Sequence, residues 1–197
     1  GSVTGNLAWA MIGLLNYYEA RGGAQYLSAA IDIGDWIYTH TYSSTGGYTG
    51  GFLGWGPDIG PVTQTWKSTE HNLDLYVAFE RLYNLTGDTT WHDRALHARR
   101  FVYDMWNEDH FWTGTYTDGV TINESVIPLD PQSWSLLAMG ENITTSAAID
   151  FAEKNLTATY TYSGDPCQGS EFEGFDFNDD RDFPWPEGTA QMIVAYW

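Results

Sequence analysis

The segment NLAWAMIGLLNYYEAR, residues 6–21, carries apolar side chains that mostly lie three or four positions apart. This spacing places them on one face of an α-helix and predicts a well-buried helix. Gly22 and Gly23 interrupt the pattern, and a second helical pattern follows in AQYLSAAIDIGDWI, residues 24–37. Because the turn between them is so short, the two helices are expected to form an antiparallel hairpin.

The same arrangement returns along the chain. A helical pattern begins at Thr69 and ends in the turn 86–88, after which a return helix is expected to run to about Trp106. A third copy begins at Pro131, and a fourth begins at Pro186 and is cut short. The first helices start about 60 residues apart, a period that fits a hairpin plus a long loop.

Repeated helical hairpins stack into a superhelix or close into a ring. Long connections, rich in Gly, Trp, Tyr and Asp, follow each return helix at 41–68, 109–130 and 158–186, whereas the turns inside hairpins are short. Functional sites are often built from long loops that gather on one rim. We therefore expect an all-α fold, an α/α toroid, with small β-hairpins in the rim loops at 46–51 and 111–121. An α-solenoid with ornamental loops is the alternative.

Each later hairpin opens with a similar string. The strings are WKSTEHN (66–72), DPQSW (130–134) and WPEGTAQ (185–191). They resemble the six-hairpin glycosidase superfamily, which implies a partial (α/α)6 barrel and activity on carbohydrates. A complete ring has six hairpins, so residues 1–197 are expected to be one toroid domain truncated at both ends, with three hairpins and the start of a fourth.

Three carboxylates lie at the starts of these helices. Helix N-termini carry partial positive charge and unpaired N–H groups, which hold a carboxylate ionised and oriented. In a toroid these N-termini face one cleft, so Glu70, Asp130 and Glu187 are expected to converge and to supply the paired carboxylates that cleave a glycosidic bond. We predict Glu70 and Glu187 as the pair, Asp130 as the next candidate, and His71 as a neighbour that tunes a pKa or binds a hydroxyl group. Alternatively, each carboxylate only caps its helix.

Aromatic rings supply a flat surface for the apolar face of a pyranose, and 16% of the residues are aromatic. Half of the tryptophans in the rim segments could instead plug the ends of the toroid. The residues expected to bind substrate, beside His71, are Trp55, Trp66, Trp112, Trp134, Trp185, Gln132 and Gln191.

The most acidic stretch spans residues 171–182. Asp176, Asn178 and Asp180 offer oxygen ligands that could hold Ca²⁺, although the spacing misses the helix–loop–helix calcium signature. We expect instead a solvated loop in which Arg181 pairs locally. No metal and no other cofactor is expected.

The formal charge of −18 argues against nucleic acid as a partner. No apolar run is long enough to span a bilayer, so membrane insertion is not expected. The single cysteine, Cys167, does not report the redox compartment. Four glycosylation sequons, together with the acidic, lysine-poor composition, favour an exported protein; they lie at Asn84, Asn123, Asn142 and Asn155.

These observations favour a secreted glycoside hydrolase. A polysaccharide lyase needs a base and a group that neutralises a uronate, and Lys67 and His71 are among few candidates. A non-catalytic glycan-binding or structural domain is the main alternative. An isoprenoid cyclase of the toroid type would need an Asp-x-Asp-Asp acid, which residues 176–180 do not match.

Overall fold

The computed structural model describes residues 2–56, 60–164, 166 and 168–197, with the exception of the Trp55 side chain. The described chain divides into two compact units, and each is considered by itself. Unit 1 comprises residues 1–105 and 114–122, and unit 2 comprises residues 106–113 and 123–197. The expected single toroid domain therefore stays a prediction.

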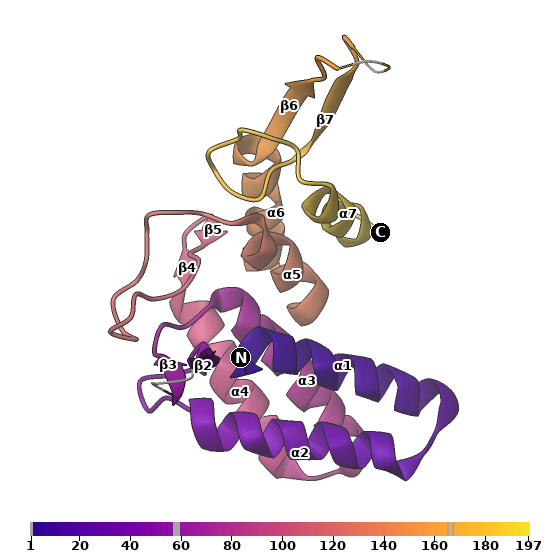
Figure 1. Cartoon of the computed structure of the whole chain (residues 1–197), viewed down its shortest axis with the longest axis vertical. Helices are drawn as coiled ribbons and strands as arrows, with labels where there is room; N and C mark the ends of the chain where they lie inside the picture. Colours follow the sequence, from indigo (N-terminus) through magenta and orange to yellow (C-terminus); the bar gives the residue numbers. More distant parts are fainter. Residues whose placement is uncertain (1, 57–59, 165, 167) are drawn as a thin grey trace. The chain divides into compact units, whose positions relative to one another are not determined.

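Unit 1 is built from two helical hairpins (Figure 1). The first consists of α1 (Thr4–Arg21) and α2 (Ala24–Thr41), and the second of α3 (Thr69–Thr86) and α4 (Thr89–Asp104). The first helices of the two hairpins, α1 and α3, pack against each other. This is the arrangement that a toroid needs, because its inner helices lie side by side.

Local chemistry sets the ends of the second hairpin. The Ser68 side chain caps α3 by accepting a hydrogen bond from the His71 N–H, and Asp88 caps α4 through the Thr90 N–H. Gly87 ends α3 in the left-handed conformation at φ 72°, which costs glycine no steric strain. The predicted turn at 86–88 is confirmed. The return helix was expected to run to about Trp106, and α4 ends slightly earlier, at Asp104, before the strand that Trp106 starts.

A small antiparallel sheet accompanies these helices. It orders β1 (Ser2–Val3), β2 (Gly51–Gly56) and β3 (Gly60–Gln64) side by side. The segment predicted as a hairpin at 46–51 overlaps a small antiparallel turn that comes before β2: Tyr42 and Tyr48 form an antiparallel bridge, and inside it the Ser43 N–H donates to the Gly47 carbonyl over 3.0 Å. The turn around Asp118 is closed by the Tyr116 N–H, which donates to the Thr121 carbonyl over 2.9 Å.

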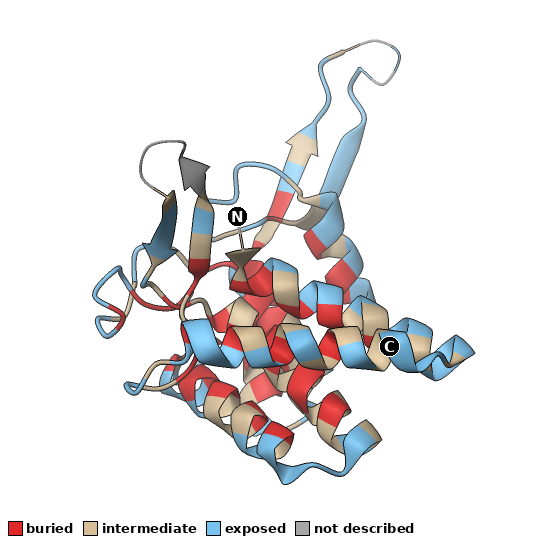
Figure 2. Cartoon of the chain, turned by 60° about the horizontal axis from the view of Figure 1, so that its bottom comes forward, coloured by how far each residue is buried: buried red, intermediate tan, exposed pale blue. Residues whose placement is uncertain are grey.

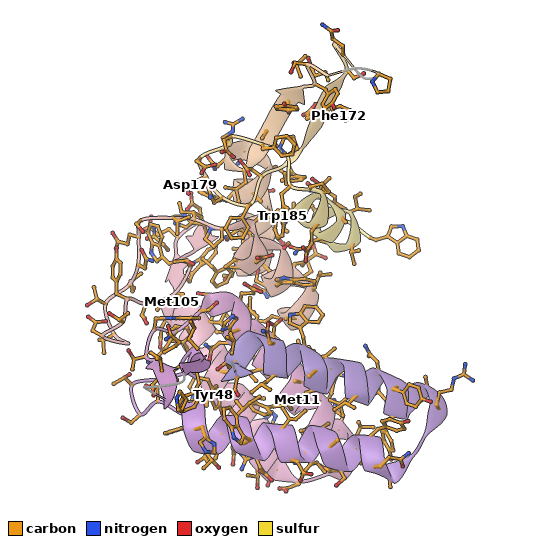
Figure 3. All side chains as sticks on the ribbon, viewed as in Figure 1. Met11, Tyr48, Met105, Phe172, Asp179 and Trp185 are labelled. Atoms are coloured by element: carbon orange, nitrogen blue, oxygen red, sulfur yellow. The ribbon has the colours of Figure 1, made fainter. Side chains whose placement is uncertain are left out.

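The core of unit 1 lies between the helices. Figure 2 shows buried positions along their facing sides, and Figure 3 labels two of the core residues, Met11 and Tyr48. The buried cluster consists of Ala8, Met11, Leu15, Ala30, Ile37, Tyr48, Leu75, Ala78, Phe79, Leu82, Trp91, Ala95 and Ala98. Small alanines let the helices approach closely, and the larger rings fill the remaining space.

Unit 2 repeats the hairpin with α5 (Leu129–Met139) and α6 (Ile143–Asn155), and then α7 (Pro186–Ala195) packs against α5. The strands β4 (Trp106–Asn107) and β5 (His110–Phe111) form a short ladder beside them. A smaller buried cluster joins α5, α6 and α7; it contains Leu129, Ile149, Ala152, Leu156 and Met192.

The acidic stretch differs from its predicted loop. Its first part is the strand β7 (Glu171–Phe175), which pairs with β6 (Thr157–Thr161) along its whole length. In β6 the threonines alternate with Ala158 and Tyr160, and in β7 Glu171 and Glu173 flank Phe172, which is the two-residue period of a strand. Arg181 does act locally, since its Nε donates to the Thr157 carbonyl over 2.6 Å.

The helical hairpins with small antiparallel hairpins between them confirm the predicted fold class. Within the described ranges, the helices are too short or too polar to cross a membrane.

Candidate functional site

Asp130 lies in the first turn of α5 and is 6% exposed. Its Oδ1 accepts a hydrogen bond of 2.8 Å from Nε2 of Gln191 on α7. The Gln191 Oε1 in turn accepts a bond of 2.9 Å from the Ser133 hydroxyl group, one turn further along α5. This chain of buried hydrogen bonds fixes the Asp130 carboxyl and joins α5 to α7, each of which is the first helix of a hairpin.

The surroundings of Asp130 favour its protonated form. Burial raises the pKa of this carboxyl above its ordinary value, although the Gln191 hydrogen bond opposes the shift. Repulsion from the Glu187 carboxylate raises the pKa further, and a hydrogen bond with the Trp134 side chain opposes it. A buried carboxyl next to a second carboxylate is the arrangement that holds a proton for general acid catalysis.

Glu187 is exposed in the first turn of α7, directly after Pro186 at the helix start. Trp185 precedes them, half-buried, and its backbone N–H donates to the Phe175 carbonyl over 2.7 Å. Its ring lies edge-on to Phe177 at 5.2 Å. The start of α7 is therefore anchored to β7, which holds Glu187 in the open beside the buried Asp130.

Gln132 was expected to bind substrate, but it is fully buried. Its Oε1 accepts from the Phe111 N–H at 2.9 Å, and its Nε2 donates to the carbonyls of Phe111 and Pro128. The amide thus completes the backbone pairing of β5. We propose a structural role for Gln132.

The start of α3 forms a separate cluster in unit 1. Glu70 is partly exposed in the first turn, and His71 follows it. The His71 ring lies so close to Gly5 of α1 that any side chain at that position would overlap it. Burial lowers the pKa of His71 to about 4, so the ring is neutral at neutral pH. Its Nδ1 is buried and makes no hydrogen bond with the described residues.

The predicted tryptophans fall into both units. Trp66 lies 5.5 Å from the His71 ring and donates from its indole N–H to Gln64 over 2.9 Å. Trp112 is half-buried in unit 2 against His110, with ring centroids 4.3 Å apart. The Trp55 side chain lies outside the described part. The structure thus groups Asp130, Glu187, Gln191, Trp134 and Trp185 in unit 2.

The remaining predicted site residues, Glu70, His71 and Trp66, form the unit 1 cluster. The pairing of Glu70 with Glu187 therefore stays a prediction.

The calcium candidates lie between β7 and α7. Carboxylate oxygens of Asp176, Asp180 and Asp182 lie within 4.8 Å of one another, whereas Asn178 caps the Asp180 N–H over 2.7 Å. Asp176 is buried and accepts hydrogen bonds from the N–H groups of Phe177 and Phe183. Two backbone N–H groups thus orient the buried carboxylate.

A hollow of about 460 Å³ opens between the β6–β7 hairpin and α7. Phe172, labelled in Figure 3, belongs to its wall. Neither Asp130 nor Glu187 lines this hollow. Its aromatic and proline residues are Tyr160, Tyr162, Phe172, Phe183, Pro184 and Pro186.

Two parts of this arrangement were missed in the sequence. Ser133 follows Asp130 by three residues, and Gln191 follows Glu187 by four, so each pair shares a helix face. That spacing was a usable signal for the Ser133–Gln191–Asp130 chain. The aromatic hollow had a weaker signal, because its wall depends on the unrecognised pairing of β6 with β7.

Comparison with solved structures identifies the class of fold. A family 76 glycoside hydrolase (mannosidase) from Bacteroides thetaiotaomicron superposes with a TM-score of 0.63 at 14% identity, over 96% of this chain and 52% of that one. A family 76 α-mannanase from the same organism gives 0.62 at 14% identity, over 98% and 51%. A cellobiose 2-epimerase from Bacillus thermoamylovorans gives 0.58 at 10% identity, over 78% and 45%.

The fold of this chain is therefore the one found in these sugar-processing enzymes, an α/α toroid of helical hairpins, as the resemblance of the helix-opening strings implied. No protein-family model matches the sequence, and no curated protein matches it. The chain spans about half the length of these solved structures.

Proposed function

We propose that this chain is part of a secreted glycoside hydrolase whose acidic pair is Asp130 and Glu187. The single observation that carries the proposal is the state of Asp130, which is buried, held by Gln191 and repelled by Glu187. Glycosidases need one carboxyl that keeps its proton and one that does not. The toroid fold, shared with glycoside hydrolases and sugar epimerases, supports action on a carbohydrate.

The roles follow from the environment of each group. Asp130, whose protonated form is favoured by its raised pKa, donates a proton to the glycosidic oxygen as the bond from that oxygen to the anomeric carbon breaks. The exposed Glu187 carboxylate removes a proton from a water molecule, whose oxygen forms the new bond to the anomeric carbon. Trp134 and Trp185 supply flat surfaces for sugar rings. Glu70 and His71 remain proposed contributors from unit 1.

The test is the release of reducing sugar by the full-length protein from α-mannan and from a panel of neutral and acidic polysaccharides. The α-mannan is chosen first because two of the similar structures act on mannan or mannosides by their names. Asp130→Asn and Glu187→Gln should each lower turnover by at least about a hundredfold while leaving helix content unchanged. The exposed Glu141→Gln, in the turn between α5 and α6, is the matched control and should keep full activity.

The pH profile gives a second readout. Because the proton on Asp130 is required, activity should fall as pH rises through the elevated pKa of this group. Full activity in Asp130→Asn would rule out its role as the acid, and full activity in both variants would sink the assignment of this pair.

A non-catalytic glycan-binding function is the second candidate. The observation that favours it is the aromatic hollow beside α7, from which both carboxylates are absent. Binding of the same polysaccharides without product release would support this alternative over hydrolysis.

Export is proposed from the sequons. Asn84 and Asn155 are exposed, and Asn123 is partly exposed, whereas the Asn142 side chain caps α6. Digestion with an N-glycosidase should increase the mobility of protein secreted from a eukaryotic host; no change would remove this support.

A further inference from the structure

A second hollow, of about 440 Å³, lies in unit 1 between the C-terminal end of α2 and the outer helix α4. It contains none of the proposed catalytic residues. Its wall combines exposed tyrosine rings with charged and hydrogen-bonding side chains, among them Tyr38, Tyr42, Asp93, Arg94, His97 and Arg100. A volume of this size lies within the range of small-ligand sites.

The aromatic side of the hollow is held in place. Tyr42 is 47% exposed, and its ring stacks on His97 with centroids 4.4 Å apart and planes tilted by 19°. The His97 Nε2 lies 3.1 Å from the Ser43 carbonyl and 3.0 Å from that of Gly47. His97 is therefore a donor at Nε2, and it fixes the Tyr42 ring to the turn that follows α2. Tyr38, 38% exposed, lies 5.3 Å from the Tyr42 ring.

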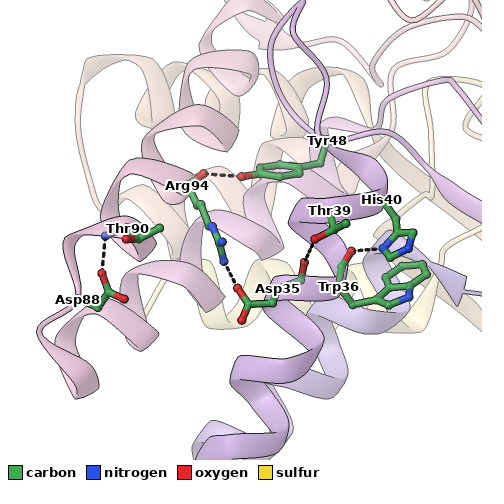
Figure 4. A network of polar contacts seen from close by, with 8 residues as sticks. All are labelled: Asp35, Trp36, Thr39, His40, Tyr48, Asp88, Thr90 and Arg94. Atoms are coloured by element: carbon green, nitrogen blue, oxygen red, sulfur yellow. Dashed lines mark hydrogen bonds and ion pairs between the residues drawn. The ribbon is translucent and has the colours of Figure 1, made fainter.

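The polar side of the hollow is balanced in charge. The Arg94 guanidinium lies 4.2 Å from the Tyr38 ring and 4.4 Å from the Trp91 ring, and its Nη1 pairs with Asp35 at 2.7 Å (Figure 4). Arg100 and Asp93 are both exposed at the rim and contribute one charge of each sign. The charge of Arg94 is balanced by Asp35, and that of Arg100 by the carboxylate of Asp93 at the same rim. The hollow is therefore not expected to select a strongly charged ligand.

We infer that this hollow is a second carbohydrate-binding site, which takes one or two neutral pyranose residues of a glycan. A pyranose offers an apolar face that fits an exposed tyrosine ring, and pairs of hydroxyl groups that match the planar ends of Asp93 and Arg100. Both helices of the site belong to one compact unit, so its walls are preformed. The suggestion that it holds a polymer for cleavage rests on the proposed hydrolase, but its ability to bind sugar does not.

The experiment maps binding by amide chemical shifts in the full chain. The probes are two neutral hexasaccharides, one from α-mannan and one from cellulose, and one acidic hexasaccharide of galacturonate. With a neutral probe, amides at the end of α2 and along α4 should shift. Tyr42→Ala should weaken this binding about tenfold, Arg100→Ala should weaken it severalfold, and Tyr42→Phe, which keeps the ring, should stay within about twofold of the wild type. Tyr116→Ala, which removes a tyrosine 46% exposed in the same unit but outside the hollow, is the control and should change nothing.

The outcomes separate the two proposals. Shifts at α2 and α4 without any hydrolysis would keep the second site and reject the hydrolase. Hydrolysis with no shifts at α2 and α4 would keep the hydrolase and reject the second site. Binding there of the acidic probe alone would overturn the assignment to neutral sugars, and equal binding by Tyr42→Ala and the wild type would overturn the site itself.

Discussion

Burial shifts the pKa values of two side chains at helix starts in opposite directions. Asp130 loses solvation in its charged form, so its pKa rises, and His71 loses solvation in its charged form, so its pKa falls to about 4. In both cases the neutral species is favoured. The raised pKa favours proton donation by Asp130, and the His71 imidazole, neutral at neutral pH, is suited to hydrogen bonding.

The shift at His71 predicts an acid sensitivity. Its pKa is lower in the folded state than the ordinary 6.5, so its contribution to stability is present above about pH 6.5 and is lost as pH falls toward 4. The loss can reach about 3 kcal/mol. Urea unfolding at pH 7.5, 5.5 and 4.5 should show a weaker pH dependence for His71→Gln than for the wild type. The exposed His40→Gln is the control, and equal pH dependence in His71→Gln and wild type would contradict the prediction.

At the scale of elements, buried amides connect loops to helices. Asn72 on α3 accepts from the Tyr48 N–H at 2.9 Å and donates to the Tyr48 carbonyl at 3.1 Å. Gln132 on α5 does the same for Phe111 in β5, at 2.9 Å for both bonds. Each side-chain amide accepts from the backbone N–H and donates to the backbone carbonyl of the same residue. In each unit it therefore fixes a loop or short strand to the start of a helix, α3 in unit 1 and α5 in unit 2.

This arrangement predicts a large cost for removing the Gln132 amide. Gln132→Leu leaves the buried Phe111 N–H and carbonyl without their partners, which should lower the free energy of unfolding by about 2–4 kcal/mol. Urea denaturation measures this change. The exposed Gln25→Leu should stay within about 0.5 kcal/mol of the wild type. A loss as small as that of the control in Gln132→Leu would show that the amide does not hold the strand.

At the scale of the whole molecule, the large negative net charge affects stability. The formal charge of −18 is spread over 197 residues, and self-repulsion of this kind destabilises a compact state. Screening by salt reduces the repulsion, since the Debye length shortens to about 10 Å at 0.1 M ionic strength.

We therefore expect the thermal midpoint to rise between about 0.02 M and 0.2 M sodium chloride, most steeply at low salt. The melts are recorded at constant pH with a chelator present, and potassium chloride at equal ionic strength should give the same rise. A midpoint that stays constant or falls would show that favourable ion pairs outweigh the net repulsion.

Much of the fold was predictable because its signals are local. The three- and four-residue spacing in 6–21 and 69–83, the glycines at the turns and the caps at Ser68 and Asp88 act within one or two turns of helix. The pairing of β6 with β7 was missed because each strand is only five residues long and Glu171–Phe175 lies in an acidic stretch that was interpreted as a loop.

The candidate site was predictable in its residue types but not in its connections. The sequence by itself determined that Asp130 and Glu187 lie at helix starts beside tryptophans. Helix starts are recognisable locally, because capping residues and acidic side chains are preferred in the first turn. Only the tertiary structure decided that Gln191, 61 residues away, holds Asp130, and that Gln132 serves the backbone of Phe111. The physical reason is that hydrogen-bond partners and pKa shifts depend on burial, which is produced by segments that meet only when the chain is folded.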